Sequence, residues 1–500
     1  MPLYAQYAQE DECTMHIQYL ASDKLMGRMT GQPGNDEAAR YIAECFREYN
    51  LEFAPGMTSY FQPVRLIKEI IPTTGTLVLM RDTLRLKRRF IPVVLTHGTF
   101  QGDAVFARFG IVDSLSGRDD YAGVEVEGKI VIVRFGKDDS TSLQDGLKMS
   151  RQKYELARAR KAAAFIEILS VDNTFAWNRI VSAFAEPSIQ LAREMESEIH
   201  WLYVYDPRKQ ISTALAKASD QKRSIRVSLN LELWRQDTIV SNNVLGVIRG
   251  KDPVLRNEYV VLSAHYDHVG VKSKAYAIQD SIYNGARDNA MGTTALLLTA
   301  KYLAAQPPKR SILVLAFTAE ELGLLGSRYY VQHPVVPNSS VVYNLNADNV
   351  GYNDTTIITV FGYGRTSVQN LINEAAKTQG LVARADNMPD EHLFDRSDNA
   401  SFASVGIPAV TIAAGITAFD NEVLKYYHQP ADQADEYFNF AYLTRYVNTV
   451  VTACRMIADA KNRPRWIEGD VYEEAFYRLY GKNSSTATKK KSPSKLKRRK

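Results

Sequence analysis

Strands and helices are predicted to alternate along the second half of this chain, and this alternation restricts the fold more than any other sequence feature. Between Asn242 and about Lys461, short runs rich in Val, Ile, Leu and Ala alternate with segments whose apolar residues have helical spacing. EYVVLSAHYDH predicts a strand and DNAMGTTALLLTAKYLAAQ a helix, and SILVLAFTAEE and LGLLGSRYYVQH repeat the pair. Such alternation is typical of a mostly parallel sheet covered by helices on both faces. We predict an α/β fold, a three-layer α/β/α sandwich with a mixed, mostly parallel sheet.

A second domain is predicted to interrupt the first. FIPVVL, DAVFARFGIV and KIVIVRFG predict short strands, and LKMSRQKYELARARKAAAFIEIL predicts a helix that runs into a further strand. We predict a discontinuous main domain of residues 1–89 and 236–475 and an inserted, smaller β/α domain of residues 90–235. The chain of 500 residues is long enough for two or three domains.

The basic charge of the chain is concentrated in its last segment. The net charge is +5, but GKNSSTATKKKSPSKLKRRK holds nine Lys or Arg and no acid, which leaves −4 for the rest. We predict that residues 481–500 form a disordered basic tail. The mildly acidic remainder gives no reason to expect nucleic acid as a partner. For the tail itself, a flexible end without a partner and contact with an anionic surface or nucleic acid are the alternatives.

Cysteine content and hydropathy narrow the class of protein further. Cys13, Cys45 and Cys454 are too few and too far apart for a disulfide framework or a thiolate metal site. No apolar run approaches the roughly 20 residues that cross a bilayer, so we expect no transmembrane segment. No signal peptide is visible as written, but MPLYAQYAQEDE resembles the small-residue end of an export signal. We therefore predict a periplasmic or secreted location, and the oligomeric state stays open.

Polar residues that can bind metal follow several of the predicted strands. In open α/β sheets, sites gather at the carboxyl ends of the strands, which is where most of these residues lie. The set comprises His265 and Asp267 in AHYDH, Asp288 in GARDNAMG, Glu320 and Glu321 in FTAEELGLLGS, Asp348 in NADNVG, and His428 in YYHQPADQAD.

These residue types suit a centre of two zinc ions. Zinc accepts imidazole nitrogen and carboxylate oxygen, and a catalytic site keeps one position open for water or substrate. Two ions about 3.5–4 Å apart can act on both the attacking and the polarised oxygen. A further carboxylate must stay off the metals to take a proton, a role we predict for Glu320. Asp267 can orient His265 from behind. The predicted ligands are His265, Asp288, Glu321, Asp348 and His428.

Each residue also has a simpler explanation when it is considered alone. A single histidine at a strand end is more often a satisfied polar residue than a ligand. A Glu-Glu pair that opens a helix is favourable beside the helix dipole. Asp288 could cap the helix that follows it, and Asp348 could belong to a turn. Because all of these explanations would have to coincide, we favour the two-metal hypothesis.

The same motifs carry a family resemblance. HYDH, GARDNAMGTTALL, FTAEELGLLGS, NADNVG and YHQPADQAD resemble the site motifs of the di-zinc exopeptidases of metallopeptidase family twenty-eight. LASDKLMGRMTGQPGNDEAARYIAECF, NNVLGVIRG and SDNASFASVGIPAV resemble three further family segments. GVEVEGKIVIVRFG and KYELARARKAAAFIEI resemble the protease-associated (PA) domain that some bacterial secreted aminopeptidases carry as an insertion. The resemblance implies a phosphorylase/hydrolase-like zinc exopeptidase fold with a PA-like insertion.

The resemblance also implies a role for each site residue. Asp288 would bridge the two zinc ions. His265 and Asp348 would complete the coordination of one ion, and Glu321 and His428 that of the other. Glu320 would take a proton from the metal-bridging water, and the resulting hydroxide would attack the scissile carbonyl. Glu320 would then pass this proton to the leaving amine.

Three positions depart from the family pattern. His268 follows the HYD triplet, and we place it behind the ligands or at the rim of the site. Arg287 stands beside Asp288 where relatives often have an acidic or polar residue. We favour a salt bridge with a neighbouring acid for it over attraction of a substrate carboxylate. Asn399 replaces a histidine common in relatives, which puts a substrate contact at that position in doubt.

The sequence therefore predicts a zinc-dependent exopeptidase, most simply an aminopeptidase that acts on peptides. The alternatives are a carboxypeptidase of the same family, a glutaminyl cyclase-like transferase and a non-catalytic, receptor-like binding protein. The complete ligand set and Glu320 disfavour the last two. The sequence does not reveal the preferred terminal residue.

Overall fold

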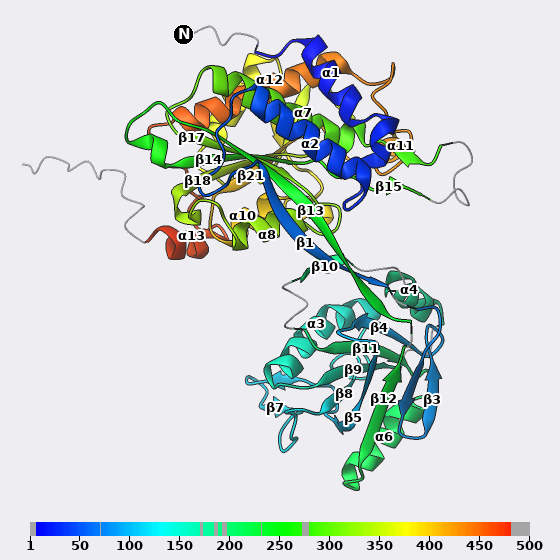
Figure 1. The fold of residues 1–500 in the computed structure, drawn as a ribbon. Coiled ribbons are helices and arrows are strands. Elements are labelled where there is room, and N and C mark those ends of the chain that lie inside the picture. The colour runs from blue at the N-terminus through cyan, green and yellow to red at the C-terminus, as the bar shows by residue number, and fades with distance from the viewer. Residues whose placement is uncertain are drawn as a thin grey trace, which may run out of the picture. The chain divides into compact units, whose positions relative to one another are not determined.

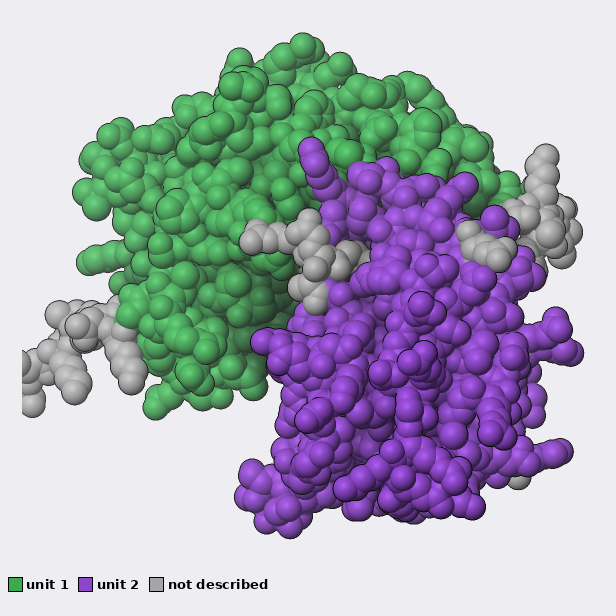
Figure 2. All heavy atoms as spheres, turned by 60° about the horizontal axis from the view of Figure 1, so that its bottom comes forward, with its two compact units in different colours: residues 1–64, 240–500 green, residues 65–239 purple. Residues whose placement is uncertain are grey.

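The chain folds into two compact units. The structure is a computed structural model that describes residues 7–70, 72–170, 174–184, 189–192, 198–231, 233–272 and 280–481. The first unit comprises Met1–Val64 and Val240–Lys500, and the second comprises Arg65–Ile239 (Figure 2). Beyond Gly481, the predicted basic tail lies outside the described residues. Among the described helices, none is both long and apolar enough to cross a membrane.

A mixed sheet forms the centre of the first unit. Its strands lie in the order β1, β13, β17, β14, β18, β21, β19 and β20, with β10 (Ile189–Leu191) of the second unit paired to residues 66–68 of β1. The strands β17, β14, β18 and β21 are parallel, whereas β13 and β19 are antiparallel to their neighbours β17 and β21. The bounds are β1 (Phe61–Ile70), β13 (Arg235–Ile248), β14 (Tyr259–His265), β17 (Ser311–Phe317), β18 (Val341–Ala347), β19 (Ile357–Phe361), β20 (Val382–Ala385) and β21 (Ala409–Ala414).

Helices cover both faces of this sheet, as Figure 1 shows. One face packs against α1 (Glu10–Leu20), α2 (Pro33–Glu48), α7 (Met291–Ala305), α9 (Gln369–Thr378) and α12 (Phe440–Asp459). The other packs against α8 (Leu325–Gln332), α10 (Asn399–Ser404) and α13 (Glu473–Tyr480). Every residue of β14, β17 and β18 is buried, which explains their continuous apolar character. The predicted three-layer α/β/α sandwich is confirmed.

Short elements connect these layers. They are η1 (Asp23–Arg28), η2 (Leu255–Asn257), β15 (Gly270–Val271), β16 (Ile282–Tyr283), the π-helical turn η3 (Ala286–Ala290), η4 (Asn338–Ser340), η5 (Pro389–Glu391) and α11 (Asn421–Tyr426). Cys13, Cys45 and Cys454 are buried and form no disulfide, in agreement with the sequence analysis.

The second unit has its own sheet and hydrophobic core. Its strands lie in the order β3, β2, β12, β5, β8, β9, β11 and β4, and β5, β8, β9 and β11 are parallel. The bounds are β2 (Thr76–Leu79), β3 (Asp82–Arg85), β4 (Phe90–Val94), β5 (Thr99–Phe106), β6 (Val112–Asp113), β7 (Arg118–Asp119), β8 (Ile130–Arg134), β9 (Ala164–Leu169), β11 (His200–Tyr205) and β12 (Ile225–Asn230), with helices α3 (Leu143–Ala159), α4 (Thr174–Phe184) and α6 (Gln210–Asp220).

The second unit begins at Arg65, whereas we placed the start of the insertion at residue 90. The strand β2 pairs with β12 through Leu79 and Val227, and β3 pairs with β2. Residues 76–85 therefore belong to the sheet of the second unit. The identity of this unit as a PA domain stays a prediction.

Candidate metal centre

The candidate site lies where three adjacent parallel strands of the first unit end. The strand β14 lies between β17 and β18, and all three run in the same direction. His265 is the last residue of β14, and Asp348 directly follows β18. The Glu320–Glu321 pair follows β17 after a short turn. The order of the strands thus brings together side chains that are far apart in the sequence.

The first donor group surrounds His265. Its Nε2 lies 3.0 Å from Asp348 Oδ1 and 3.5 Å from Asp288 Oδ1. Glu320 Oε2 lies farther away, 3.9 Å from the same nitrogen. Ser397 donates a hydrogen bond of 2.5 Å to Asp348 Oδ2, which leaves Oδ1 directed at His265.

The second donor group surrounds His428, which follows α11. Its Nε2 lies 3.2 Å from Asp288 Oδ2 and 3.2 Å from Glu321 Oε2. His268 joins this group, with Nδ1 2.8 Å from Glu321 Oε1. The described residues hold two clusters with metal-ligand geometry, His268–Asp288–Glu321–His428 and His265–Glu320–Asp348.

Asp288 links the two groups because each of its carboxylate oxygens faces a different one. Oδ1 faces His265 and Oδ2 faces His428. The residue lies in η3, where its backbone N–H donates to Asp432 Oδ2 at 3.2 Å, and a cis peptide bond joins it to Asn289. This orientation is the one that a bridging carboxylate requires.

The donor separations fit tetrahedral zinc. Ligands 2.0–2.1 Å from a tetrahedral zinc ion lie about 3.3 Å from one another. The separations of His428 from Asp288 and Glu321 are both 3.2 Å, and those of His265 from Asp348 and Asp288 are 3.0 and 3.5 Å. The five predicted ligands therefore leave room for one ion in each group. Glu320, at 3.9 Å, is the outlier.

Burial and the closeness of several carboxylates shift the pKa values of the site residues. Burial alone would lower the pKa of His428, but hydrogen bonds to Asp288 and Glu321 raise it to about 10. Burial also opposes protonation of His265, yet the charges of Asp348 and Glu320 raise its pKa well above the usual value. Burial raises the pKa of Glu320 well above its usual value, with Asp348 adding to the shift. A buried excess of carboxylates of this kind suits divalent cations.

The carboxylate of Asp267 lies closer to the backbone of the glutamate pair than to the ring of His265. Its Oδ1 lies 3.7 Å from His265 Nδ1, whereas its own backbone oxygen lies 3.2 Å from that nitrogen. The carboxylate accepts the backbone N–H groups of Glu320 at 3.1 Å and Glu321 at 3.3 Å. We expected this side chain to orient His265. In the structure it also fixes the turn that carries the glutamates, and its role in orienting His265 stays a prediction.

Arg287 and Asn399 are occupied by structural contacts. Arg287 Nη1 donates to Asp432 at 2.9 Å, and its guanidinium lies 3.6 Å from the centre of the Tyr426 ring. The structure thus shows the salt bridge that we favoured from the sequence. Asn399 is buried and accepts a hydrogen bond from the hydroxyl of Thr411 at 2.8 Å.

Sequence reasoning did not single out two residues that support the site. Ser397 fixes Asp348, and its position in SDNASF beside the metal motifs was the available signal. Arg28 is buried in η1 and donates to the backbone oxygens of Tyr266, Asn284 and Gly285. It therefore ties the segment after β14 to the segment before Asp288. Its role could not be seen in the sequence because all its partners are backbone atoms.

The centre opens into a small pocket of about 40 Å³ within the first unit. Val350, Phe361 and Leu393 give it an apolar wall. Arg396 also lines it, with Nη2 donating to the hydroxyl of Tyr427 at 3.1 Å and Nη1 3.4 Å from Glu391.

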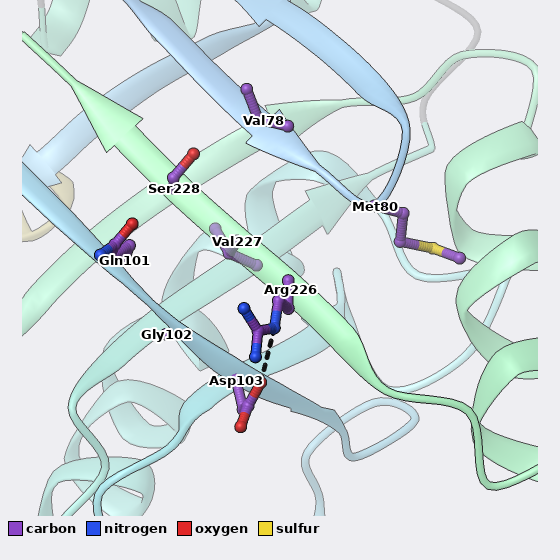
Figure 3. A pocket seen from close by; sticks show the side chains of 8 residues that line it. All are labelled: Val78, Met80, Gln101, Gly102, Asp103, Arg226, Val227 and Ser228. Carbon is purple, nitrogen blue, oxygen red and sulfur yellow. Dashed lines mark ion pairs between the residues drawn. The ribbon is translucent and has the colours of Figure 1, made fainter.

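A larger hollow of about 370 Å³ lies on the sheet of the second unit (Figure 3). Its charged residues are Arg226 and Asp103, which pair with each other at 3.4 Å and are mostly exposed. Its lining includes no histidine and no second carboxylate. The residue types that bind metal therefore identify the smaller pocket as the candidate site.

Comparison with known proteins agrees with this geometry. Residues 243–453, which include all the predicted ligands, match Peptidase family M28. These residues therefore form a domain of Peptidase family M28. The family resemblance predicted from the motifs is therefore confirmed.

Two curated proteins similar to this chain are named as aminopeptidases. Aminopeptidase YwaD of Bacillus subtilis is 29% identical over 211 residues, which is 42% of each chain. A probable leucine aminopeptidase 2 of Aspergillus oryzae is 27% identical over 311 residues, 59% of this chain and 54% of the relative. The match thus spans about half the length of these curated relatives. A solved aminopeptidase from Aneurinibacillus sp. strain AM-1 has the same fold, with a TM-score of 0.52 at 19% identity over 92% of this chain and 95% of that one.

Proposed function

We propose that this protein is a zinc-dependent aminopeptidase that removes N-terminal residues from peptides. The observation that carries the proposal is the position of Asp288, whose two oxygens face two separate donor groups. The names of the relatives support the same activity. We propose His265, Asp348 and Asp288 as ligands of one ion, and His428, Glu321 and Asp288 as ligands of the other.

The chain's own residues supply the proton chemistry. When bound, two zinc ions polarise a carbonyl oxygen and increase the acidity of water. Glu320 is partly buried beside the donor groups, and its greater distance from His265 suits a general base better than a ligand. Its carboxylate takes a proton from the attacking water and then delivers it to the leaving amine. Asp267 holds the glutamate in place through its backbone N–H.

The charge of the pocket favours an amino terminus over a carboxyl terminus. Four carboxylates line it, namely those of Asp288, Glu320, Glu321 and Asp348. Arg396 is the only Lys or Arg among its lining residues, and it already contacts Glu391 and Tyr427. The lining therefore offers no unpaired Lys or Arg to a substrate carboxylate, and a terminal ammonium group is the better match. The apolar wall of Val350, Phe361 and Leu393 favours an apolar first side chain.

The test is an assay of aminoacyl chromogenic amides with and without a chelator. We expect hydrolysis that the chelator abolishes, that added zinc restores, and that Glu320→Gln lacks. Glu44→Gln, an exposed change on α2, is the matched control and should retain full activity. Zinc binding without amide hydrolysis, together with release of C-terminal residues, would instead support the carboxypeptidase alternative. A periplasmic or secreted location stays a prediction that cell fractionation can test.

A further inference from the structure

His268 makes the two donor groups unequal. The group around His265 contains one imidazole, whereas the group around His428 contains two. His268 is buried, and its Nδ1 lies 2.8 Å from Glu321 Oε1. From the sequence we placed this residue behind the ligands or at the rim, without a partner.

The distances separate a positioning role from metal ligation. Two ligands of one tetrahedral zinc ion lie about 3.3 Å apart, a separation that His428 and Glu321 show at 3.2 Å. The contact of His268 with Glu321 is shorter, at 2.8 Å, and is a normal hydrogen-bond length. His268 Nδ1 also lies 4.0 Å from Asp288 Oδ2, farther than the roughly 3.3 Å between two ligands of one tetrahedral ion.

The two oxygens of Glu321 consequently have different partners. Oε1 accepts from His268, and Oε2 faces His428. The carboxylate of Glu321 is therefore held between the two imidazoles.

The imidazole of His268 has little freedom to move. A Cβ atom added at Gly285 would lie 2.6 Å from His268 Cδ2, so only a glycine backbone can pack this closely against the ring. Gly285 also has a φ of +60°, which favours glycine. The main chain of His268 is fixed as well, because its backbone N–H donates to the backbone oxygen of Arg28 at 3.3 Å. The ring is therefore fixed in front of Glu321.

We propose that His268 is a positioning residue that donates its Nδ1–H to Glu321 Oε1 and thereby leaves Oε2 as the single oxygen available to the ion beside His428. This inference rests on the proposed function, because it assumes that the centre binds metal. The inference predicts an effect on only one of the two ions. Loss of the donor weakens metal binding beside His428 and leaves the ion beside His265 and Asp348 largely unaffected.

Three variants test the donor itself. His268→Leu fills a similar space without a donor, whereas His268→Asn places an amide nitrogen near the position of Nδ1. His428→Ala removes a ligand of the same ion. Each purified protein is titrated with zinc in competition with a chromophoric chelator, which yields the stoichiometry and both dissociation constants without any activity assay.

We expect His268→Leu to raise one zinc dissociation constant by about 10–100-fold and to leave the other unchanged, since loss of a hydrogen-bond partner behind a ligand has effects of this size. His268→Asn should restore binding to within about threefold of wild type. In the His428→Ala background, His268→Leu should have no further effect on the remaining ion.

Three results would overturn the inference. They are an unchanged constant in His268→Leu, failure of His268→Asn to restore binding, and equal weakening of both ions. Failure of the asparagine variant would indicate direct ligation by the imidazole instead. If wild-type protein bound no zinc at all, the proposed function would fall, and this inference with it. Two ions in wild type with no effect of His268→Leu would reject only the role of His268.

Discussion

The carboxylate of Asp267 holds the main chain of Glu320, because Oδ1 of Asp267 accepts the backbone N–H of Glu320 at 3.1 Å. The proposed general base thus has its main chain fixed while its carboxylate faces the metal-binding groups. The same aspartate accepts the N–H of Glu321, so one side chain sets the turn that carries both base and ligand. The segment from His265 to His268 therefore supplies a proposed ligand, the residue that fixes this turn, and the histidine that contacts Glu321.

Removal of the Asp267 carboxylate should impair catalysis without touching the base. We expect Asp267→Ala to lower kcat by about 10–100-fold, because the turn loses two acceptors behind the metal centre. Asp267→Asn keeps one acceptor oxygen and should lose less. Steady-state kinetics with an aminoacyl amide provide the measurement. A wild-type kcat in Asp267→Ala would show that the turn keeps its shape without this contact.

The two adjacent glutamates should differ in their effect on metal content. Glu320→Gln should lower kcat by about 10²–10⁴-fold and keep the zinc content of wild type, as expected for loss of a general base. Glu321→Gln should lose activity together with the ion beside His428. Elemental analysis after gel filtration, combined with kinetics, distinguishes the two. Loss of zinc in Glu320→Gln would make it a ligand and require another base.

Arg287 should contribute to stability and not to substrate selection. Its guanidinium is buried against Asp432 and Tyr426, so Arg287→Ala leaves a buried carboxylate without its cationic partner. We expect a loss of about 3–5 kcal/mol in the free energy of unfolding, measured by denaturant titration. The additional change Asp432→Asn should recover part of this loss. A changed ratio of kcat/KM for acidic over neutral substrates would instead support contact with a substrate carboxylate.

Acid should destabilise the first unit through His16. This histidine is buried on α1, with its ring nitrogens 2.7 Å from the Tyr41 hydroxyl and 3.1 Å from that of Tyr49. Burial lowers its pKa from 6.5 to about 4 in the folded state. The unfolded chain therefore takes up the proton first, and stability falls as the pH drops from about 6.5 towards 4.

The pH dependence can be isolated by comparison with His16→Gln, which keeps a polar side chain that does not titrate. Between pH 7 and pH 5, zinc-saturated wild type should lose about 2 kcal/mol more unfolding free energy than the variant. Parallel pH profiles of the two proteins would show that His16 binds its proton equally in both states.

The sequence sufficed for the strands that end at the site, because β14, β17 and β18 are apolar runs with polar residues directly after them. The sequence was insufficient where the structure depends on the direction of a side chain or on the pairing of distant segments. The residues around Leu79 have an alternating pattern that suits either sheet, and only their pairing with Val227 assigns them to the second unit. The partners of Asp267 and His268 depend on the path of the backbone after β14, which motif spacing does not define.

Zinc-edge anomalous diffraction from crystals of zinc-saturated protein tests the central claim most directly. The account predicts two peaks about 3.5–4 Å apart, one on each side of the Asp288 carboxylate. One peak should lie beside His265 and Asp348, and the other beside His428 and Glu321. A single peak, or two peaks that do not share Asp288, would contradict it.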